Sequence, residues 1–448
     1  MAPPTCLDNM TGQNGIVQVV VDTAEKKTQS PSLLDADEFR RQSHQVVDLI
    51  AEYYDRMGDY PVHPTVTPGF LRNVLPPDAP FRPEPDAFSS ALKDDIGALG
   101  EALTAGINVV PFTWAASPAA TELEMLVVDW LGKALHLPES LLFAGGGGGT
   151  LLGTSCEAIL CTLVAARDRK LAEIGERRIC DLVVYCSDQT HFAFRKAARI
   201  AGILRDHCRA IPTCHENMFA LSPKELEAAL QADVEAGLVP LFLCATLGTT
   251  QTTAVDPIAE LCAVTAPHGV WVHVDAAYAG SALVCPEFTH LIDGVEAVDS
   301  FSMNAHKWLL ANNDCCAMWV KKPSALVAAL GPEQDLILKD AASEGQNVVD
   351  YMDWTMTLTR HRKFALVCFR LRSQDKFGGA DKQAANRLNR RLLEEVNAAT
   401  SGPYMSSATV GGMFILRCAI GSTLTEEHHV SDAWKVVQDQ ATIILRNN

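Results

Sequence analysis

The pattern of apolar and polar residues predicts two amphipathic helices in the first third of the chain. Between Asp35 and Tyr54 the apolar positions recur at helical spacing, and Asp35 can serve as the N-cap. Residues 118–136 repeat this pattern after Pro118, and proline is common at the first position of a helix. Between these segments, residues 60–85 are rich in proline and predict an extended arm that lies against another surface, with a partner subunit as one candidate.

Farther along the chain, short apolar runs alternate with segments of helical periodicity. The apolar runs are Asp181–Cys186, Val239–Ala245 and Val270–Val274. The helical segments are 156–174, 191–203, 223–236 and 256–266. This alternation predicts an α/β fold with a mostly parallel central sheet and helices on both faces. A strand at Val410–Ala419 followed by a helix at Leu424–Leu445 predicts a smaller C-terminal α/β domain.

Composition and charge indicate which binding partners and which cellular compartment to expect. The chain has 448 residues, of which 48% are hydrophobic, so it can bury a large core. Its net charge of −17 argues against binding to nucleic acid or to an anionic membrane. The 14 cysteines are irregularly spaced and indicate reduced thiols in a cytoplasmic protein. The sequence shows no signal peptide, bilayer-spanning run or metal-ligand spacing, and we therefore expect a soluble protein without a metal.

In open α/β sheets, ligands bind at the carboxyl ends of the strands, and four features of the sequence fall at such ends. The first is a run of small residues, Gly145–Gly149, followed by Gly153–Ala158 and an apolar helix. Free backbone N–H groups at the start of a helix suit a phosphate dianion. The alternative is a flexible loop with an N-cap at Thr154 or Ser155, and the sequence does not separate the two interpretations.

The second and third features are single residues that follow predicted strands. His191 suits either stacking against a planar cofactor or proton transfer, and the alternative is a capping or core histidine. Asp275 ends the strand Val270–Val274, where a buried carboxylate requires a cation. That cation is either a protonated pyridine nitrogen or an arginine elsewhere in the chain. Residues 245–250 supply hydroxyl groups at another strand end.

The fourth feature is Lys307, within the segment Ser300–Trp308. A lysine in this setting is either a surface charge or an amine in a dry pocket, where burial favours the neutral, nucleophilic form. Such an amine can form an imine with an aldehyde cofactor. In chain order, the four features supply a phosphate cradle, a stacking imidazole, an acid for a ring nitrogen and an imine-forming amine. Together they indicate a single cofactor with those parts.

These segments resemble the group II pyridoxal-phosphate decarboxylases, and most closely the plant aromatic-L-amino-acid decarboxylases, which act on tryptophan and tyrosine. The resemblance is carried by Phe112–Trp114, Ser117–Glu124, Gly153–Ala158, Ser187–His191, Ala245–Thr250, His273–Gly280 and Asn304–Trp308. It implies pyridoxal 5'-phosphate as the cofactor, fold type I, and a homodimer with its active sites at the subunit interface. It also implies a tail, helix and dimer arm at 1–94, a large cofactor-binding domain at 95–362, and a shortened C-terminal domain at 363–448.

The resemblance also implies roles for individual residues. Lys307 matches the Schiff-base lysine, Asp275 the partner of the pyridinium nitrogen, and His191 the histidine that stacks on the cofactor ring. The residues that match further cofactor contacts are Ser155, Cys156, Thr250, Asn304 and His306. The residues that match substrate contacts are Tyr60, Pro61, Val62, His191 and Thr359. The implied reaction is decarboxylation of an aromatic L-amino acid to the arylalkylamine and carbon dioxide.

The chain departs from the family at two gaps and in one loop. Sequence is missing next to Ile96, where the family has aromatic residues that wall the substrate pocket, and after Arg360, where it has a helix joining the two domains. In the loop Gly331–Lys339 the family's decarboxylases carry a tyrosine that protonates the product carbon, and this chain has none. The loop favours an aromatic acetaldehyde synthase as one alternative, and the gaps favour a catalytically impaired, truncated homologue as another.

Overall fold

The computed structural model describes most of the chain. The described residues are 36–59, 66–79, 96–107, 109, 111, 113–114, 116–309, 311–331, 349–354, 366–371, 382–399, 403–410, 412–419 and 426–446. Within them, no helix is both long enough and apolar enough to cross a membrane.

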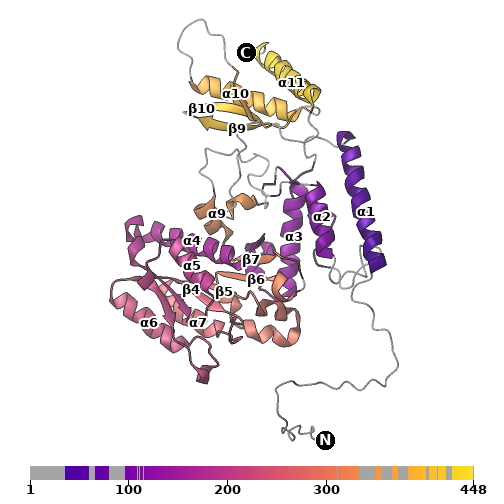
Figure 1. Cartoon of the computed structure of the whole chain (residues 1–448). Helices are drawn as coiled ribbons and strands as arrows, with labels where there is room; N and C mark the ends of the chain where they lie inside the picture. Colours follow the sequence, from indigo (N-terminus) through magenta and orange to yellow (C-terminus); the bar gives the residue numbers. More distant parts are fainter. Residues whose placement is uncertain are drawn as a thin grey trace, which may run out of the picture.

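A seven-stranded sheet forms the centre of the fold (Figure 1). In spatial order its strands are β1 (Gly148–Leu152), β7 (Cys316–Val320), β6 (Ser300–Asn304), β5 (Trp271–Asp275), β4 (Val239–Thr246), β2 (Leu182–Ser187) and β3 (Cys208–Ile211). The strands from β6 to β3 run parallel, whereas β7 is antiparallel to both of its neighbours. The predicted mostly parallel sheet is confirmed.

Helices cover both faces of this sheet, as the alternating pattern predicts. On one face lie α4 (Ser155–Ile174), α5 (Phe192–Ile200) and α9 (Pro323–Leu330). On the other lie α3 (Pro118–Ala134), α6 (Pro223–Glu235) and α7 (Ile258–Thr265). Alternate residues of β4 join the two apolar layers, with Phe242 and Cys244 in the first layer and Leu243 and Ala245 in the second. Burial on both faces explains why the strands read as continuous apolar runs.

Most predicted boundaries lie within a few residues of the observed ones. The helix predicted at 191–203 ends at Ile200, because Gly202 adopts a left-handed φ of +85° that terminates it. The apolar pattern of the sequence does not predict strands β1 and β3, because of the composition of β1 and the short length of β3. Two of the five residues of β1 are glycine, and β3 is only four residues long.

The N-terminal helices pair with each other, and the described part of the arm packs on its own chain. Helix α1 (Ala36–Asp55) contacts α2 (Ile96–Ile107). The buried carboxylate of Glu122, in α3, accepts hydrogen bonds from the backbone N–H groups of Gly69 (2.6 Å) and Leu71 (3.0 Å) and from the Trp114 indole (2.9 Å). Residues 66–79 of the arm are therefore held by α3 of the same subunit.

A three-stranded antiparallel sheet lies near the C-terminus (Figure 1). Its order is β8 (Leu366–Phe369), β10 (Met413–Ala419) and β9 (Ser406–Val410), with helices α10 (Lys382–Ala398) and α11 (Glu427–Arg446) packed against it and each other. The strand predicted at Val410–Ala419 is observed as the end of β9 and all of β10, because the chain turns at Gly412, where φ is +74°. The division of the chain into three regions stays a prediction.

Four of the five glycines in the run 145–149 are needed for close packing. A Cβ atom on Gly147 would lie 2.4 Å from the Ser140 carbonyl oxygen. On Gly149, within β1, it would lie 2.4 Å from Val128 Cγ1 and 2.6 Å from the Met318 carbonyl oxygen. Gly149 therefore lets β1 approach α3 and β7, and the phosphate interpretation of the glycine-rich segment stays a prediction.

We expect Gly149→Ala to lower the free energy of unfolding by about 1–3 kcal/mol, since the new methyl group overlaps backbone that cannot move independently. Urea unfolding of the purified protein measures this change. The matched control is Gly100→Ala in α2, where a Cβ atom meets nothing within 4 Å and where alanine favours the helix. Equal stability of Gly149→Ala and the parent protein would contradict the packing role.

Candidate active site

Four parallel strands end in polar residues along one edge of the central sheet. Strands β2, β4, β5 and β6 end at Ser187, Thr246, Asp275 and Asn304. Thr246 is the register partner of Asp275, which in turn pairs with Ser302 of β6. The segments that follow these strands carry His191, Thr250 and Lys307 to the same edge, so the strand ends bring the predicted residues together.

The first turn of α4 reaches this edge through the register of β1. Leu152 of β1 and Asn304 of β6 both pair with Cys316 of β7, and Ser155 follows three residues after Leu152. The Ser155 hydroxyl donates to Asn304 Oδ1 at 2.6 Å. The structure therefore joins two predicted cofactor contacts that are 149 residues apart in the sequence.

The N-terminus of α4 keeps free backbone donors for an anion. Thr154 is the N-cap, and its side chain accepts the N–H of Glu157 at 3.4 Å, so the predicted capping role is confirmed for Thr154. The other N–H groups of the first turn have no intrahelical acceptor, and the positive end of the helix dipole adds to their effect. Cys156 is half-buried beside Ser155. This turn can hold a phosphate group.

Asp275 is a buried carboxylate that receives few hydrogen bonds from the protein. Its residue is 4% exposed, and Oδ1 accepts one hydrogen bond, from the N–H of Ala277 at 3.1 Å. Burial raises the pKa of Asp275, while the Ala277 N–H and the nearby charges of Lys307 and His191 lower it. No lysine or arginine forms an ion pair with Asp275 in the described part of the chain. The geometry therefore favours an external cation, such as a protonated ring nitrogen.

His191 lies at the start of α5 and has two roles there. Its Nδ1 accepts the N–H of Ala193 at 3.3 Å, so it caps the helix, as the structural alternative predicts. The same ring is half-buried and lies close enough to Asp275 to affect its ionisation. Because Nδ1 is an acceptor, the proton of the neutral ring is on Nε2. The capped orientation leaves this N–H available to a bound ligand.

Lys307 is exposed in the single chain, which does not bury the amine in a dry pocket as the sequence predicts. It lies in α8 (Ala305–Trp308), a helix of only four residues that directly follows β6. The next residue, Trp308, stacks on Tyr278 with ring centroids 5.0 Å apart and is itself 50% exposed. The charge of Lys307 nevertheless lies close enough to Asp275 to lower the pKa of that carboxyl.

The remaining predicted contacts differ in how firmly they are held. His306 Nδ1 accepts the N–H of Cys315 at 2.9 Å, and its Nε2 lies 3.4 Å from Asn304 Nδ2, so both residues are fixed at the edge of the sheet. Thr250 is exposed, whereas its neighbour Thr249 is buried and accepts the N–H of Ala254 at 3.0 Å. The predicted substrate contacts Tyr60, Pro61, Val62 and Thr359 lie outside the described residues.

Two further polar residues lie next to Asp275: Thr246, within the hydroxyl-bearing stretch 245–250 noted in the sequence, and Ser302, whose place beside Asp275 the sequence did not predict. The hydroxyl of Thr246 is buried and has no hydrogen-bond partner among the described residues. Ser302, on the other side of Asp275, is fully buried. Polar residues at every second position of a buried strand, as in His273–Asp275 and Ser300–Ser302, were the available signal. No cluster of metal-ligating side chains occurs in the part of the chain that the structure describes.

Comparison with known proteins identifies the family of this chain. The family model for the pyridoxal-dependent decarboxylase conserved domain matches residues 79–401. A tyrosine decarboxylase of Oryza sativa subsp. japonica is 64% identical, covering 100% of this chain and 99% of its own length. That alignment runs over 530 positions, so at least 82 of them have no counterpart among the 448 residues here, in agreement with the predicted internal gaps.

Two solved structures share the fold. The Catharanthus roseus tryptophan decarboxylase in complex with L-tryptophan is 40% identical, with a TM-score of 0.56, and the match covers 93% of this chain and 100% of that one. The Rhodiola rosea 4-hydroxyphenylacetaldehyde synthase is also 40% identical, with a TM-score of 0.55 and coverage of 92% and 100%. The predicted fold class is thereby confirmed.

We expect Asp275→Asn to stabilise the cofactor-free protein by about 0.5–2 kcal/mol at pH 7. The folded-state pKa is raised above its unfolded value, so ionisation of Asp275 favours unfolding, and this cost grows as the pH rises from the unfolded pKa to the folded one. Asparagine removes the cost. Urea unfolding at pH 4 and at pH 7 measures both the gain and its growth with pH.

The matched control for that substitution is Asp233→Asn. Asp233 is also buried, but it accepts the Tyr185 hydroxyl at 2.9 Å and forms an ion pair with Arg209. Its loss should therefore destabilise the protein by about 1–3 kcal/mol. An Asp275→Asn protein less stable than the parent would show that Asp275 has a structural partner and is not reserved for a ligand.

Proposed function

The chain belongs to the pyridoxal-dependent decarboxylase family, and we propose that it removes the carboxylate of an aromatic L-amino acid as carbon dioxide and releases the arylalkylamine. The observation that carries this proposal is the buried Asp275 carboxylate, whose pKa is lowered by the charges of His191 and Lys307 and which forms no ion pair with a lysine or arginine among the described residues. The aromatic substrate is supported by the tyrosine and tryptophan decarboxylases to which the chain is similar.

The residues at the sheet edge fit the parts of pyridoxal 5'-phosphate. The N-terminus of α4 with Ser155 would hold the phosphate, Asp275 the ring nitrogen and Lys307 the aldehyde carbon. When bound, this cofactor supplies an aldehyde that links to amines and a protonated ring that takes up the electrons left by a departing carboxylate. Asp275, as an anion, keeps that ring nitrogen protonated because separating the two charges in a buried site is costly.

His191 is the candidate for positioning the substrate and for proton transfer. Its Nδ1 is engaged by the Ala193 N–H, and this bond fixes the orientation of the imidazole. Its Nε2–H can then donate to a substrate carboxylate or phenolic oxygen without a rotation of the ring. Cys156, Thr250, Asn304 and His306 are proposed as the remaining cofactor contacts.

We propose a homodimer as the active form, in the cytoplasm. Lys307 is exposed in the single chain, its neighbour Trp308 is 50% exposed, and Phe192, which follows His191, is 68% exposed. Exposed aromatic side chains next to a polar site favour burial against another protein surface. A second copy would cover Lys307 and exclude water from the amine. Residues 1–94, 95–362 and 363–448 are proposed as the dimer arm, large domain and small domain.

An aromatic acetaldehyde synthase is the second candidate function. The observations that favour it are the absence of tyrosine from residues 331–339 and the similarity to the Rhodiola rosea enzyme. Without a proton donor on this loop, the product carbon would be open to oxidation by dioxygen. Product analysis with tyrosine and tryptophan separates the two: amine with carbon dioxide alone, or aldehyde with ammonia and hydrogen peroxide.

A catalytically impaired homologue is the third candidate. The 82 or more missing positions include, in our reading of the sequence, one wall of the substrate pocket. This candidate predicts that the protein binds the cofactor but turns over neither amino acid. Cofactor binding and turnover are therefore measured on the same preparation.

Lys307→Ala should abolish the visible absorption band that the parent protein gains with pyridoxal phosphate, and should lower turnover of tyrosine or tryptophan by about a thousandfold or more. The control is Lys321→Ala, because Lys321 lies at the far end of β7 and donates to the Glu296 carbonyl at 2.7 Å. A parent protein without such a band would contradict the proposed cofactor, and a band retained by Lys307→Ala would contradict the role of Lys307.

Phe192→Glu should shift the protein from dimer to monomer, because it places a charge on an exposed aromatic position beside the site. Sedimentation velocity measures the mass, with 48.5 kDa expected for one chain. Val234→Glu is the control, since Val234 is 45% exposed near the end of α6, which leads into the opposite end of β4. A parent protein that sediments as a single chain would contradict the dimer.

A further inference from the structure

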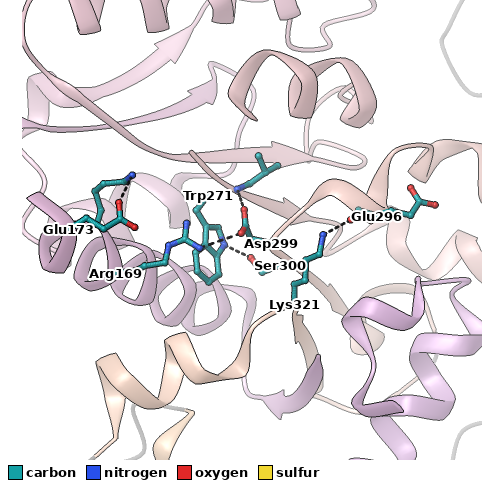
Figure 2. A network of polar contacts seen from close by, with 9 residues as sticks. Arg169, Glu173, Trp271, Glu296, Asp299, Ser300 and Lys321 are labelled. Carbon is teal, nitrogen blue, oxygen red and sulfur yellow. Dashed lines mark hydrogen bonds and ion pairs between the residues drawn. The ribbon is translucent and has the colours of Figure 1, made fainter. Parts of the chain in front are cut away.

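A buried chain of polar side chains runs along β5 and β6 behind Asp275. The Trp271 indole N–H donates to Ser300 Oγ at 2.8 Å, as Figure 2 shows. Ser300 Oγ lies 2.8 Å from His273 Nδ1, and His273 Nε2 lies 3.2 Å from Ser302 Oγ. All four residues are buried, and the chain ends beside Asp275, the register partner of Ser302. Such a chain in an otherwise apolar layer requires an explanation.

The donors and acceptors in this chain fix its direction. An indole N–H can only donate, so Ser300 Oγ accepts from Trp271 and must place its own proton elsewhere. Among the described residues, His273 Nδ1 is the acceptor within reach, and any other arrangement leaves a buried hydroxyl proton unpaired. His273 Nδ1 is therefore unprotonated, and its proton lies on Nε2, from which it is donated to Ser302.

The imidazole of His273 stays neutral, so Nδ1 remains an acceptor and Nε2 a donor. His273 is fully buried, and burial lowers its pKa to about 3. The hydroxyl of Ser302, which accepts from His273, is then free to donate in turn. His273 and Asp275 are two residues apart on one strand, so their side chains share a face of the sheet, and Ser302 lies next to both. The hydrogen bonds from Ser300 to His273 and from His273 to Ser302 thus both run toward the residue that pairs with Asp275.

The far end of the chain is held in place by charge. The guanidinium of Arg169 lies 4.7 Å from the centre of the Trp271 ring and 3.5 Å from Asp299 (Figure 2). Asp299 also accepts the N–H of Val272 at 3.0 Å. These contacts fix the indole whose N–H sets the direction of the chain. The other neighbour of Asp275, Thr246, offers a second buried hydroxyl with no partner in the described part of the structure.

We propose that His273 is a positioning residue for the cofactor: through Ser302, it orders the hydrogen bonds behind Asp275 so that the carboxylate stays anionic and faces the pyridine nitrogen. This inference rests on the proposed cofactor. His273 does not touch the cofactor, and its effect passes through Asp275. The predicted consequence is specific, because only a ligand with a basic ring nitrogen benefits from an anionic Asp275.

The test compares two ligands on the cofactor-free protein. One is pyridoxal phosphate, and the other is its analogue with carbon in place of the ring nitrogen. Quenching of tryptophan fluorescence gives a dissociation constant for each, and their ratio measures the contribution of the nitrogen. We expect His273→Phe to reduce the preference for pyridoxal phosphate by roughly tenfold, the size of one hydrogen bond to a charged group. His273→Gln, which keeps a donor near the Nε2 position, should restore most of it.

Two further variants separate this role from a loss of stability. Ser302→Ala is a smaller change that removes the last hydroxyl of the polar chain, next to Asp275. It should lower the ratio of the two dissociation constants as His273→Phe does, and it replaces His273→Phe as the test if the His273→Phe protein does not fold. Tyr185→Phe removes a buried 2.9 Å hydrogen bond to Asp233 elsewhere in the sheet and should leave the ratio unchanged. An unchanged ratio in Ser302→Ala overturns the inference. A parent protein that binds both ligands equally, or neither, contradicts the proposed cofactor itself.

Discussion

The buried carboxylate of Asp275 is the constraint on which the rest of the site depends. It ends a strand that is buried on both faces, where desolvation disfavours a charge, and the described residues offer it one backbone N–H as a hydrogen-bond donor. Protein folds retain such a group only when something else compensates. In the proposed site a cationic ring nitrogen does so, with the helix start at Ser155, the capped imidazole of His191 and the amine of Lys307 at the same edge of the sheet.

The order of the site residues along the sheet follows from parallel pairing. Because β2, β4, β5 and β6 run in one direction, their carboxyl ends form a single edge, and residues far apart in the sequence meet there. Strand β1 joins this edge through the antiparallel strand β7, and its glycines permit the close approach that places Ser155 beside Asn304. The register of the strands therefore determines how the site residues are spaced along this edge of the sheet.

Sequence reasoning identified the fold class and the motifs at the strand ends, because apolar runs and strand-end polar residues are local signals. It left the glycines 145–149 open between a phosphate site and a loop, since the sequence does not show that Ser140, Val128 and Met318 approach them. It also expected Lys307 to be buried, and the single chain leaves this residue exposed, because residue types near Lys307 in the sequence do not show which surfaces cover it. The polar chain through His273 was missed because each of its residues alone reads as ordinary core.

Reduction of the cofactor-loaded protein with borohydride, followed by peptide mapping, tests the central claim most directly. This treatment fixes pyridoxal phosphate to whichever amine holds it. If Asp275 and Lys307 share one ligand, the added mass lies on the peptide that contains Lys307, and Asp275→Asn reduces the yield. Label spread over several surface lysines, or a yield that does not depend on Asp275, would contradict the account.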